Sequence, residues 1–347
     1  MAAEGVRSVV LADVTLRDGS HTVNHSFTTE QVRRVVAGLD RAGVPIVEVC
    51  HGDGLGGSSY QYGFSAVPEL ELIEAAAQTA RRAKISVLLL PGIGVRDDLR
   101  QAAALGATVA RIATHVTEAD IAEQHIGLAK ELGMTAVGFL MMAHTGSPEV
   151  VARQGRIMER AGADVVYVVD SAGAMTMEDV HARVSALREA LACDVGFHAH
   201  NNLGLGVGNT ITAARAGATW LDGSMCGFGA GAGNAQTEAL VAVLQKLGYE
   251  CGVDLLPLLD AADAVVRPLL PRPQVLDSKS LILGFAGVYS SFLLHAERAA
   301  ERFDVDPREV LVEAGRLKSV GGQEDILVEI ALGLSTRGAG QAEAVTR

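Results

Sequence analysis

The strongest constraint on the fold is a regular alternation of short β-rich segments with longer amphipathic segments, which continues to about residue 250. The β-rich segments predict strands at residues 9–14, 45–50, 85–90, 109–113, 136–141, 165–169, 195–200 and 220–223. The amphipathic segments predict helices at residues 29–42, 68–83, 97–105, 119–132, 148–161, 177–191, 205–216 and 235–247. Strands that alternate with helices in this way pair in parallel.

Eight such units predict an α/β fold of the (β/α)8 TIM-barrel type. A doubly wound open sheet is the alternative, but it usually carries a phosphate-binding glycine loop directly after its first strand. The segment VTLRDGSH at residues 14–21 contains no such loop. The closed barrel is therefore the better prediction.

After about residue 255 the pattern becomes helical throughout, with predicted helices at residues 255–270, 278–303, 307–318 and 323–334. We expect a barrel domain over residues 1–265 and a small C-terminal helical domain over residues 266–347. This second domain is expected to pack on the barrel, and roughly the last 12 residues are expected to be disordered.

Charge and composition exclude several classes of protein. The formal net charge of -12 disfavours binding to nucleic acid, whose phosphates a chain this acidic would repel. The N-terminus lacks the basic and apolar regions of a signal peptide, and the apolar runs are too short to span a membrane. The four cysteines are widely scattered, which indicates reduced thiols in a cytoplasmic protein.

Polar residues gather where the predicted strands end, which is the end of a TIM barrel that carries the active site. Six of the ten histidines of the chain fall at these positions. They are His21, His51, His115, His144, His198 and His200. The starts of the strands are mostly apolar, so this rim is predicted to be the catalytic one.

His198 and His200 are two residues apart on a predicted strand, so their side chains point to the same side. They could hold a divalent ion, with Asp18 as the best candidate for a carboxylate ligand and Asp170 as the alternative. Alternatively, the two histidines have no metal-binding role and are core residues that hydrogen-bond to their neighbours. An ion held by only three protein ligands keeps open coordination positions, which could be filled by the carboxylate and ketone oxygens of a 2-oxo acid.

Arg17 adjoins Asp18, and its charge suits a negative group on a ligand better than it suits a metal. An ion pair with Glu48 or Asp13 is the structural alternative, and Glu48 could also orient Arg17 toward a ligand. His21 is a candidate general acid or base, or simply a histidine of an exposed loop.

Two other kinds of active site, a lysine Schiff base and a dinucleotide site, find less support in the sequence. None of the lysines falls at a predicted strand end on the catalytic rim, which disfavours a Schiff-base aldolase. The glycine-rich loops at residues 53–59 and 227–234 do not have the dinucleotide-binding pattern, so no organic cofactor is expected. Leu88 and Leu90 alternate on the third strand, where they either line a substrate pocket or fill the core.

Several segments together resemble the 4-hydroxy-2-oxovalerate aldolases, which belong to a wider family with hydroxymethylglutaryl-CoA lyase and isopropylmalate synthase. LRDG at 16–19 and HAH at 198–200 are typical of the wider family. GDGLGGSS at 52–59, GVYSSFLLHAERAAER at 287–302 and VGGQED at 320–325 indicate the aldolase branch. The resemblance covers almost the whole chain and also implies a TIM barrel.

The resemblance implies that Asp18, His198 and His200 bind a divalent metal, most commonly Mn²⁺, with Mg²⁺ or Co²⁺ as alternatives. It implies that Arg17, supported by Glu48, stabilises a pyruvate enolate. His21 would take the proton of the C4 hydroxyl, Ser171 would contact the substrate carboxylate, and Tyr289 would reach in from the tail to set stereochemistry at C4. The residues expected to contact the substrate are Arg17, Ser171, His198, Tyr289, Leu88 and Leu90.

The function predicted in this way is a divalent-metal-dependent (class II) aldolase, which reversibly cleaves 4-hydroxy-2-oxopentanoate, or a close relative, to pyruvate and acetaldehyde. The resemblance also implies that an acylating acetaldehyde dehydrogenase docks on the helical tail and receives the aldehyde, as in aromatic catabolism. The alternatives are a Claisen-type enzyme that condenses acyl-CoA with a 2-oxo acid, and a scaffold without activity that only stabilises a dehydrogenase.

Overall fold

A closed barrel of eight parallel strands forms the body of the protein in the computed structural model, which describes residues 7–290, 292–319 and 323–345. The strands follow one another around the barrel in chain order, and β2 closes it by pairing with β9. They are β2 (Val10–Leu16), β3 (Ile46–Val49), β4 (Lys84–Leu89), β5 (Ala107–His115), β6 (Thr135–Met141), β7 (Val165–Asp170), β8 (Asp194–Ala199) and β9 (Trp220–Gly223). The predicted TIM barrel is confirmed.

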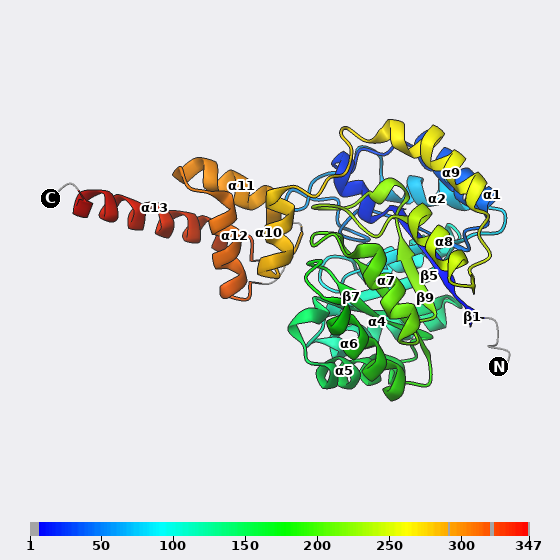
Figure 1. Ribbon diagram of the computed structural model, residues 1–347. Helices are drawn as coiled ribbons and strands as arrows, with labels where there is room; N and C mark the ends of the chain where they lie inside the picture. The colour runs from blue at the N-terminus through cyan, green and yellow to red at the C-terminus, as the bar shows by residue number, and fades with distance from the viewer. Residues whose placement is uncertain (1–6, 291, 320–322, 346–347) are drawn as a thin grey trace.

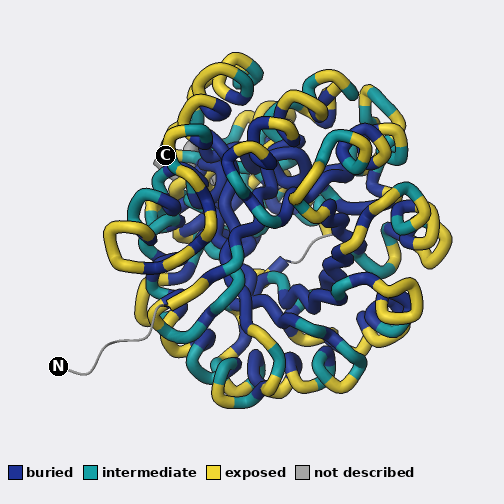
Figure 2. Tube along the Cα trace, turned by 90° about the vertical axis from the view of Figure 1, so that its right-hand side faces the viewer, coloured by how far each residue is buried: buried dark blue, intermediate teal, exposed yellow. Residues whose placement is uncertain are grey.

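Helices surround this barrel, as Figure 1 shows. They are α1 (Thr29–Ala42), α2 (Glu69–Thr79), α3 (Arg96–Ala104), α4 (Glu123–Glu131), α5 (Pro148–Arg160), α6 (Met177–Ala190), α7 (Gly206–Arg215) and α8 (Thr237–Lys246). Figure 2 shows buried segments gathered around the barrel interior and exposed segments at its periphery. The predicted helix ends lie close to the observed ones because the sequence carries capping residues at both ends of several helices. In α1, Thr28 forms a capping box with Gln31, and Gly43 ends the helix with a φ of 88°.

One small sheet was not predicted. β1 (Arg7–Ser8) pairs in parallel with β10 (Tyr249–Glu250), just before the chain enters β2 and just after α8. Two residues on each side are too few to produce a recognisable period in the sequence.

The C-terminal region is helical, as expected, but its helices are more broken than predicted. α9 (Leu255–Ala261) continues as the π-helix η5 (Ala262–Val266) and the 3₁₀ helix η6 (Arg267–Leu269). The prediction of one helix over residues 278–303 is wrong. The structure has α10 (Ser278–Ala286), which ends at Gly287 in the left-handed conformation with a φ of 68°, and α11 (Phe292–Phe303). This break carries residues 287–290 toward the mouth of the barrel.

Two hydrophobic cores divide the chain. Leu269 and Leu270 still pack against the barrel core, whereas Leu283 belongs to a second core with residues of α11, α12 (Pro307–Arg316) and α13 (Ile326–Val345). The segment at residues 271–277 lies between the last residues packed on the barrel core and the first residues of the second core.

The ends of the chain and one motif are only partly described. The segment expected to be disordered lies partly in α13 and partly, at residues 346–347, outside the described residues. Residues 320–322 of the VGGQED segment also lie outside them, as do residues 1–6. Within the described ranges, no helix combines the length and apolar character that crossing a membrane requires.

Gly196 on β8 offers a test of how tightly the barrel interior is packed. A Cβ atom on this residue would lie 2.2 Å from the ring of Tyr167, which is fully buried. We expect Gly196→Ala to lower the free energy of unfolding by about 1–3 kcal/mol, because the ring has no room to move. Gly127→Ala, in α4 with no described heavy atom within 4 Å of the added methyl, should be neutral or stabilising. Denaturant unfolding of both variants measures the difference.

Candidate active site

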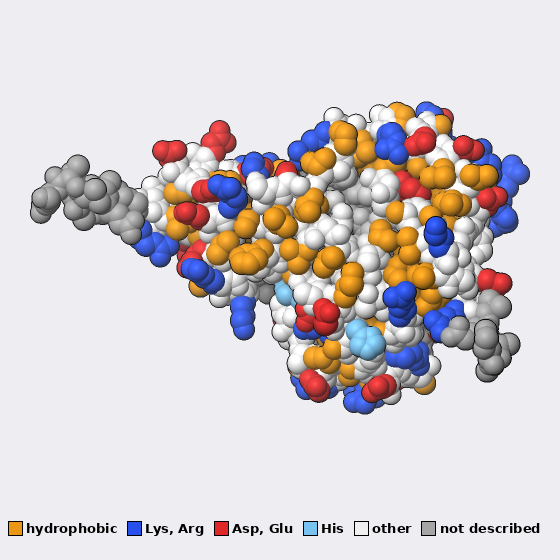
Figure 3. Space-filling model, viewed as in Figure 1, with side chains coloured by type: hydrophobic (Ala, Val, Ile, Leu, Met, Phe, Trp, Pro, Cys, Tyr) orange, Lys and Arg blue, Asp and Glu red, His pale blue; other side chains and the backbone are white. Residues whose placement is uncertain are grey.

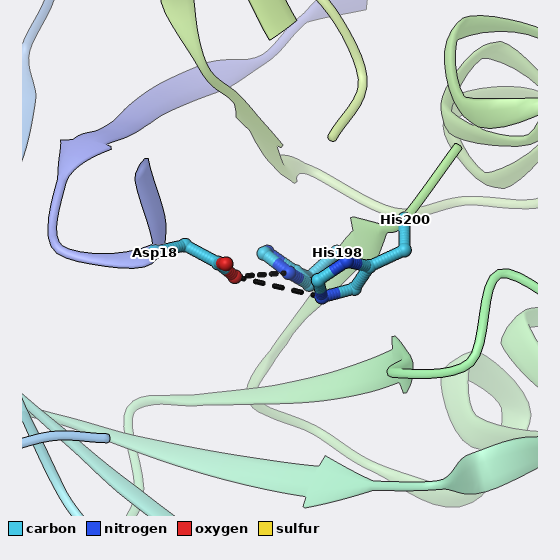
Figure 4. A group of neighbouring side chains, drawn as sticks. All are labelled: Asp18, His198 and His200. Carbon is cyan, nitrogen blue, oxygen red and sulfur yellow. Dashed lines mark ion pairs between the residues drawn. The ribbon is translucent and has the colours of Figure 1, made fainter. Parts of the chain in front are cut away.

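Three side chains converge at the C-terminal end of the barrel (Figure 4). Asp18 begins the 3₁₀ helix η1 (Asp18–Val23) directly after β2, His198 lies on β8, and His200 follows that strand. The Asp18 Oδ2 atom lies 3.3 Å from His198 Nε2 and 3.5 Å from His200 Nε2. All three residues are buried.

These distances suit a divalent ion. Ligand atoms that each lie about 2.1 Å from one ion are separated by roughly 3.0–3.5 Å, as these are. The chemistry of the donors also fits, because His198 Nδ1 lies 2.9 Å from Asp222 Oδ2. Asp222 is a carboxylate whose pKa is lowered to about 2, against the effect of its burial, by Arg111 and His198. It therefore accepts the Nδ1 proton of His198, which leaves the Nε2 lone pair free for an ion.

The charge states of the other two candidate ligands point the same way. Burial would raise the pKa of Asp18, but Arg17 and the two histidines outweigh it and hold the pKa well below its ordinary value. Burial lowers the pKa of His200 to about 4. An ionised carboxylate and a neutral imidazole are the forms that bind metals.

Arg17 lies beside this group and is held in place from two sides. Its Nε atom donates to Glu48 Oε2 at 2.7 Å, and its Nη1 atom donates to Asp18 Oδ2 at 3.0 Å. Its Nη2 atom is buried and finds no hydrogen-bond partner among the described residues. Because Arg17 lines the central cavity, this free donor is available to an anionic ligand.

The alternatives left open by the sequence find other partners. Asp13 accepts hydrogen bonds from Thr15 N at 3.0 Å and Thr237 Oγ1 at 2.8 Å, and not from Arg17. Asp170 accepts the backbone N–H groups of Ala174 and Met175, at 2.9 and 3.1 Å. Asp170 thus shapes the loop after β7, and Asp18 is the carboxylate that lies against the two histidines.

A cavity of about 1210 Å³ opens above these residues. Five further residues that the sequence predicts to act on or contact the substrate line it: His21, Leu88, Leu90, Ser171 and Tyr289. The Ser171 Oγ atom accepts the Met142 N–H at 3.0 Å. Tyr289 comes from the break between α10 and α11, and burial raises the pKa of its hydroxyl.

Sequence reasoning missed a cluster of histidines around His21. The ring of His25 lies edge-on to His21, with 4.9 Å between centroids, and it stacks on His51 at 3.8 Å. Burial and these two neighbours lower the pKa of His25 to about 3, so its ring is neutral. Its Nδ1 atom lies 2.9 Å from Ser20 Oγ. The stacked rings of His25 and His51 thus form one side of the pocket around His21, and the His25 ring contacts His21 directly.

A second missed group lies below the site, inside the barrel. Arg111 on β5 donates to both oxygens of Asp222, at 2.6 and 2.8 Å, and its Nε atom lies 3.4 Å from Glu48 Oε1. Its Nη2 atom also lies 3.3 Å from the hydroxyl of Tyr167. All four residues are buried.

Asn202 attaches the helical region to the barrel. Its Nδ2 atom donates to Ser290 Oγ at 2.8 Å and to Ala172 O at 2.9 Å, and its Oδ1 atom accepts the Ala232 N–H at 2.9 Å. His144 Nε2 lies 3.2 Å from Gly287 O, which holds the same segment from another side. These contacts keep Tyr289 over the cavity.

Comparison with known proteins identifies the family. A family model described as HMGL-like matches residues 8–265, and one described as the DmpG-like communication domain matches residues 274–336. The 4-hydroxy-2-oxovalerate aldolase of Carboxydothermus hydrogenoformans is 58% identical over 329 residues, which cover 95% of this chain and 98% of that protein. The chain belongs to the 4-hydroxy-2-oxovalerate aldolase family. It is therefore a carbon–carbon lyase.

Another aldolase of this name, from Chloroflexus aggregans, is 59% identical over 331 residues, which cover 95% of this chain and 96% of that protein. Among solved structures, the carboxyl transferase domain of Rhizobium etli pyruvate carboxylase with pyruvate and biocytin matches with a TM-score of 0.81 and 17% identity. That match covers 96% of the aldolase and 61% of the other chain, and it concerns the fold alone.

Proposed function

We propose that this aldolase is metal-dependent and cleaves 4-hydroxy-2-oxopentanoate, or a close 4-hydroxy-2-oxo acid, to pyruvate and acetaldehyde. The observation that carries the proposal is the free Nη2 donor of Arg17 beside the group of Asp18, His198 and His200. A class II aldolase needs such a pairing, because it must hold a 2-oxo acid and stabilise the enolate left by C–C cleavage.

The side chains at the barrel mouth have separate tasks. A divalent ion such as Mn²⁺, bound by Asp18, His198 and His200, would supply Lewis-acid polarisation of the 2-oxo acid. Arg17 directs Nη2 toward the negative charge that develops on the substrate, and Glu48 keeps the guanidinium at that angle. No organic cofactor is needed for this chemistry.

The outer residues act on the other half of the substrate. His21 takes the C4 hydroxyl proton as the C3–C4 bond breaks, and the pyruvate enolate then gains a proton at C3. Leu88 and Leu90 form an apolar wall for the aldehyde portion. Ser171 contacts the substrate carboxylate, and Tyr289 determines the stereochemistry at C4.

The helical region over residues 266–347 is proposed as the docking surface for an acylating acetaldehyde dehydrogenase. Figure 3 shows hydrophobic side chains gathered around α10 on this face. The exposed apolar residues of this region include Phe285, which is 74% exposed, and Leu276, Leu281 and Leu294. Apolar surface of this kind marks a protein contact.

A cytoplasmic location goes with the proposal, since all four cysteines are free thiols.

The test is pyruvate release from a panel of 4-hydroxy-2-oxo acids after chelation and after return of Mn²⁺, Mg²⁺ or Co²⁺. We expect loss of activity on chelation and its restoration by at least one of the three ions, with Asp18→Asn not restored at the same ion concentration. Turnover of acetyl-CoA with a 2-oxo acid, and none of the panel, would favour the Claisen-type alternative. Inactivity of a Mn²⁺-loaded sample with every substrate would favour the scaffold.

A further inference from the structure

A closed ring of polar contacts links the metal side of the site to Arg17. In order, the contacts join His198 Nδ1 to Asp222 (2.9 Å), Asp222 to Arg111 (2.6 and 2.8 Å), and Arg111 Nε to Glu48 Oε1 (3.4 Å). They continue from Glu48 Oε2 to Arg17 (2.7 Å), from Arg17 to Asp18 (3.0 Å) and from Asp18 to His198 Nε2 (3.3 Å).

We propose that Arg111 is a positioning residue that fixes the metal ligand His198 and the guanidinium of Arg17 relative to each other. Arg111 does not line the cavity, and its ion pairs join it to the two carboxylates that it bridges. The proposal rests on the proposed function of the site, and it adds Arg111 and Asp222 to the residues that the reaction requires.

On one side, Arg111 determines what Asp222 can do for His198. Its planar fork holds both oxygens of Asp222, so the carboxylate remains ionised and can accept the Nδ1 proton from one direction only. A ligand histidine whose second nitrogen is held in this way presents Nε2 to the ion at a fixed angle.

On the other side, Arg111 restrains Glu48. Each oxygen of Glu48 faces a different arginine, Oε1 toward Arg111 and Oε2 toward Arg17. Rotation of Glu48 would break its hydrogen bond with Arg17 or its longer ion pair with Arg111, in which Glu48 Oε1 and Arg111 Nε lie 3.4 Å apart without hydrogen-bond geometry. Because Glu48 is fully buried, water cannot replace the lost contact, and the angle of Arg17 is set by Arg111 through Glu48.

The charges of the ring explain why it needs to be complete. Two guanidiniums and three carboxylates give a net charge of -1 when the histidines are neutral. A divalent ion changes this to +1, which suits an anionic 2-oxo acid. Removing one arginine would leave buried carboxylates unpaired, and these would draw protons or a displaced ion.

Three single variants separate the two sides of the ring. The measurements are Mn²⁺ affinity, by the magnetic resonance signal of free Mn²⁺, and exchange of the pyruvate C3 protons with solvent at saturating Mn²⁺. Asp222→Asn should weaken Mn²⁺ binding about 10–100-fold and, through Arg111 and Glu48, also slow exchange at saturating Mn²⁺ by about 10-fold. Glu48→Gln should change Mn²⁺ affinity little and slow exchange on the order of 100-fold. Arg111→Lys should show both losses, because a point charge cannot bridge the two carboxylates.

Arg183→Lys is the matched control for losing a buried arginine. Arg183 donates to the backbone oxygens of Ala143, His144 and Gly146, outside the ring. This control should lower the melting temperature but leave Mn²⁺ affinity and exchange unchanged. Arg111→Lys with unaltered affinity and exchange would overturn the proposal, and so would losses that Arg183→Lys reproduces.

A double-mutant cycle keeps the proposal testable if Arg111→Lys does not fold. Glu48→Gln and Asp222→Asn lie on opposite sides of Arg111 and leave it in place. The fold-loss of exchange in the double variant should be at least about 3-fold smaller than the product of the two single fold-losses. The reason is that the second change acts on a ring that the first has already opened. Strictly multiplicative losses would refute the coupling. Metal binding is measured without turnover, so failure of the proposed reaction would not be mistaken for failure of the ring.

Discussion

Arg17→Ala is expected to lose aldol cleavage and pyruvate C3 proton exchange together, each by about 10³-fold or more. Both reactions pass through the pyruvate enolate, and the variant removes a buried guanidinium that lines the cavity and whose Nη2 has no partner among the described residues. Loss of a single well-placed donor to a developing oxyanion costs about 10²–10³-fold, and loss of a buried positive charge adds to this. Pyruvate release and the exchange of C3 protons for deuterium, followed by NMR, measure the two rates.

Arg17→Lys is the appropriate companion variant. It retains the charge but cannot donate to Glu48, Asp18 and a ligand from one rigid plane. It should recover only a small part of either rate. Exchange at the normal rate in Arg17→Ala, in a sample that still binds Mn²⁺, would show that another group stabilises the enolate.

The strands of this fold could be predicted because each carries its own local signal. Runs such as those of β5 and β7 are apolar and β-branched, and a glycine ends several of the preceding helices. The break at Gly287 was missed, although a left-handed glycine ends α10 there as one ends α1. The surrounding residues favour a helix, and it is the contacts of Ser290 with Asn202 and Ser171 that hold the chain away from one.

The same distinction separates the candidate ligands from their supports. Asp18, His198 and His200 are polar residues at strand ends, where a barrel places its chemistry, so position alone indicated them. Arg111 and Asp222 lie within strands, and their contact joins residues 111 positions apart. His25 is close to His21 in sequence, but only the fold brings His51 against it. Contacts of this kind depend on barrel closure, which no local pattern contains.

His21→Ala is expected to separate cleavage from exchange. Cleavage needs a base for the C4 hydroxyl and should fall by about 10²–10⁴-fold, the usual contribution of a positioned general base. Exchange of the pyruvate C3 protons involves no C4 hydroxyl, and it should remain within about 10-fold of the original rate. The ratio of the two rates, measured on one Mn²⁺-loaded sample, is the informative quantity because damage to the metal site would lower both.

His115→Ala is the matched control, since His115 also lines the cavity but its Nδ1 atom lies 2.8 Å from the Thr117 hydroxyl of its own loop. The ratio of cleavage to exchange should not change in this variant. Equal losses of the two rates in His21→Ala would remove His21 from the role of base. His21, which lies edge-on to His25, would then act on the enolate half of the reaction.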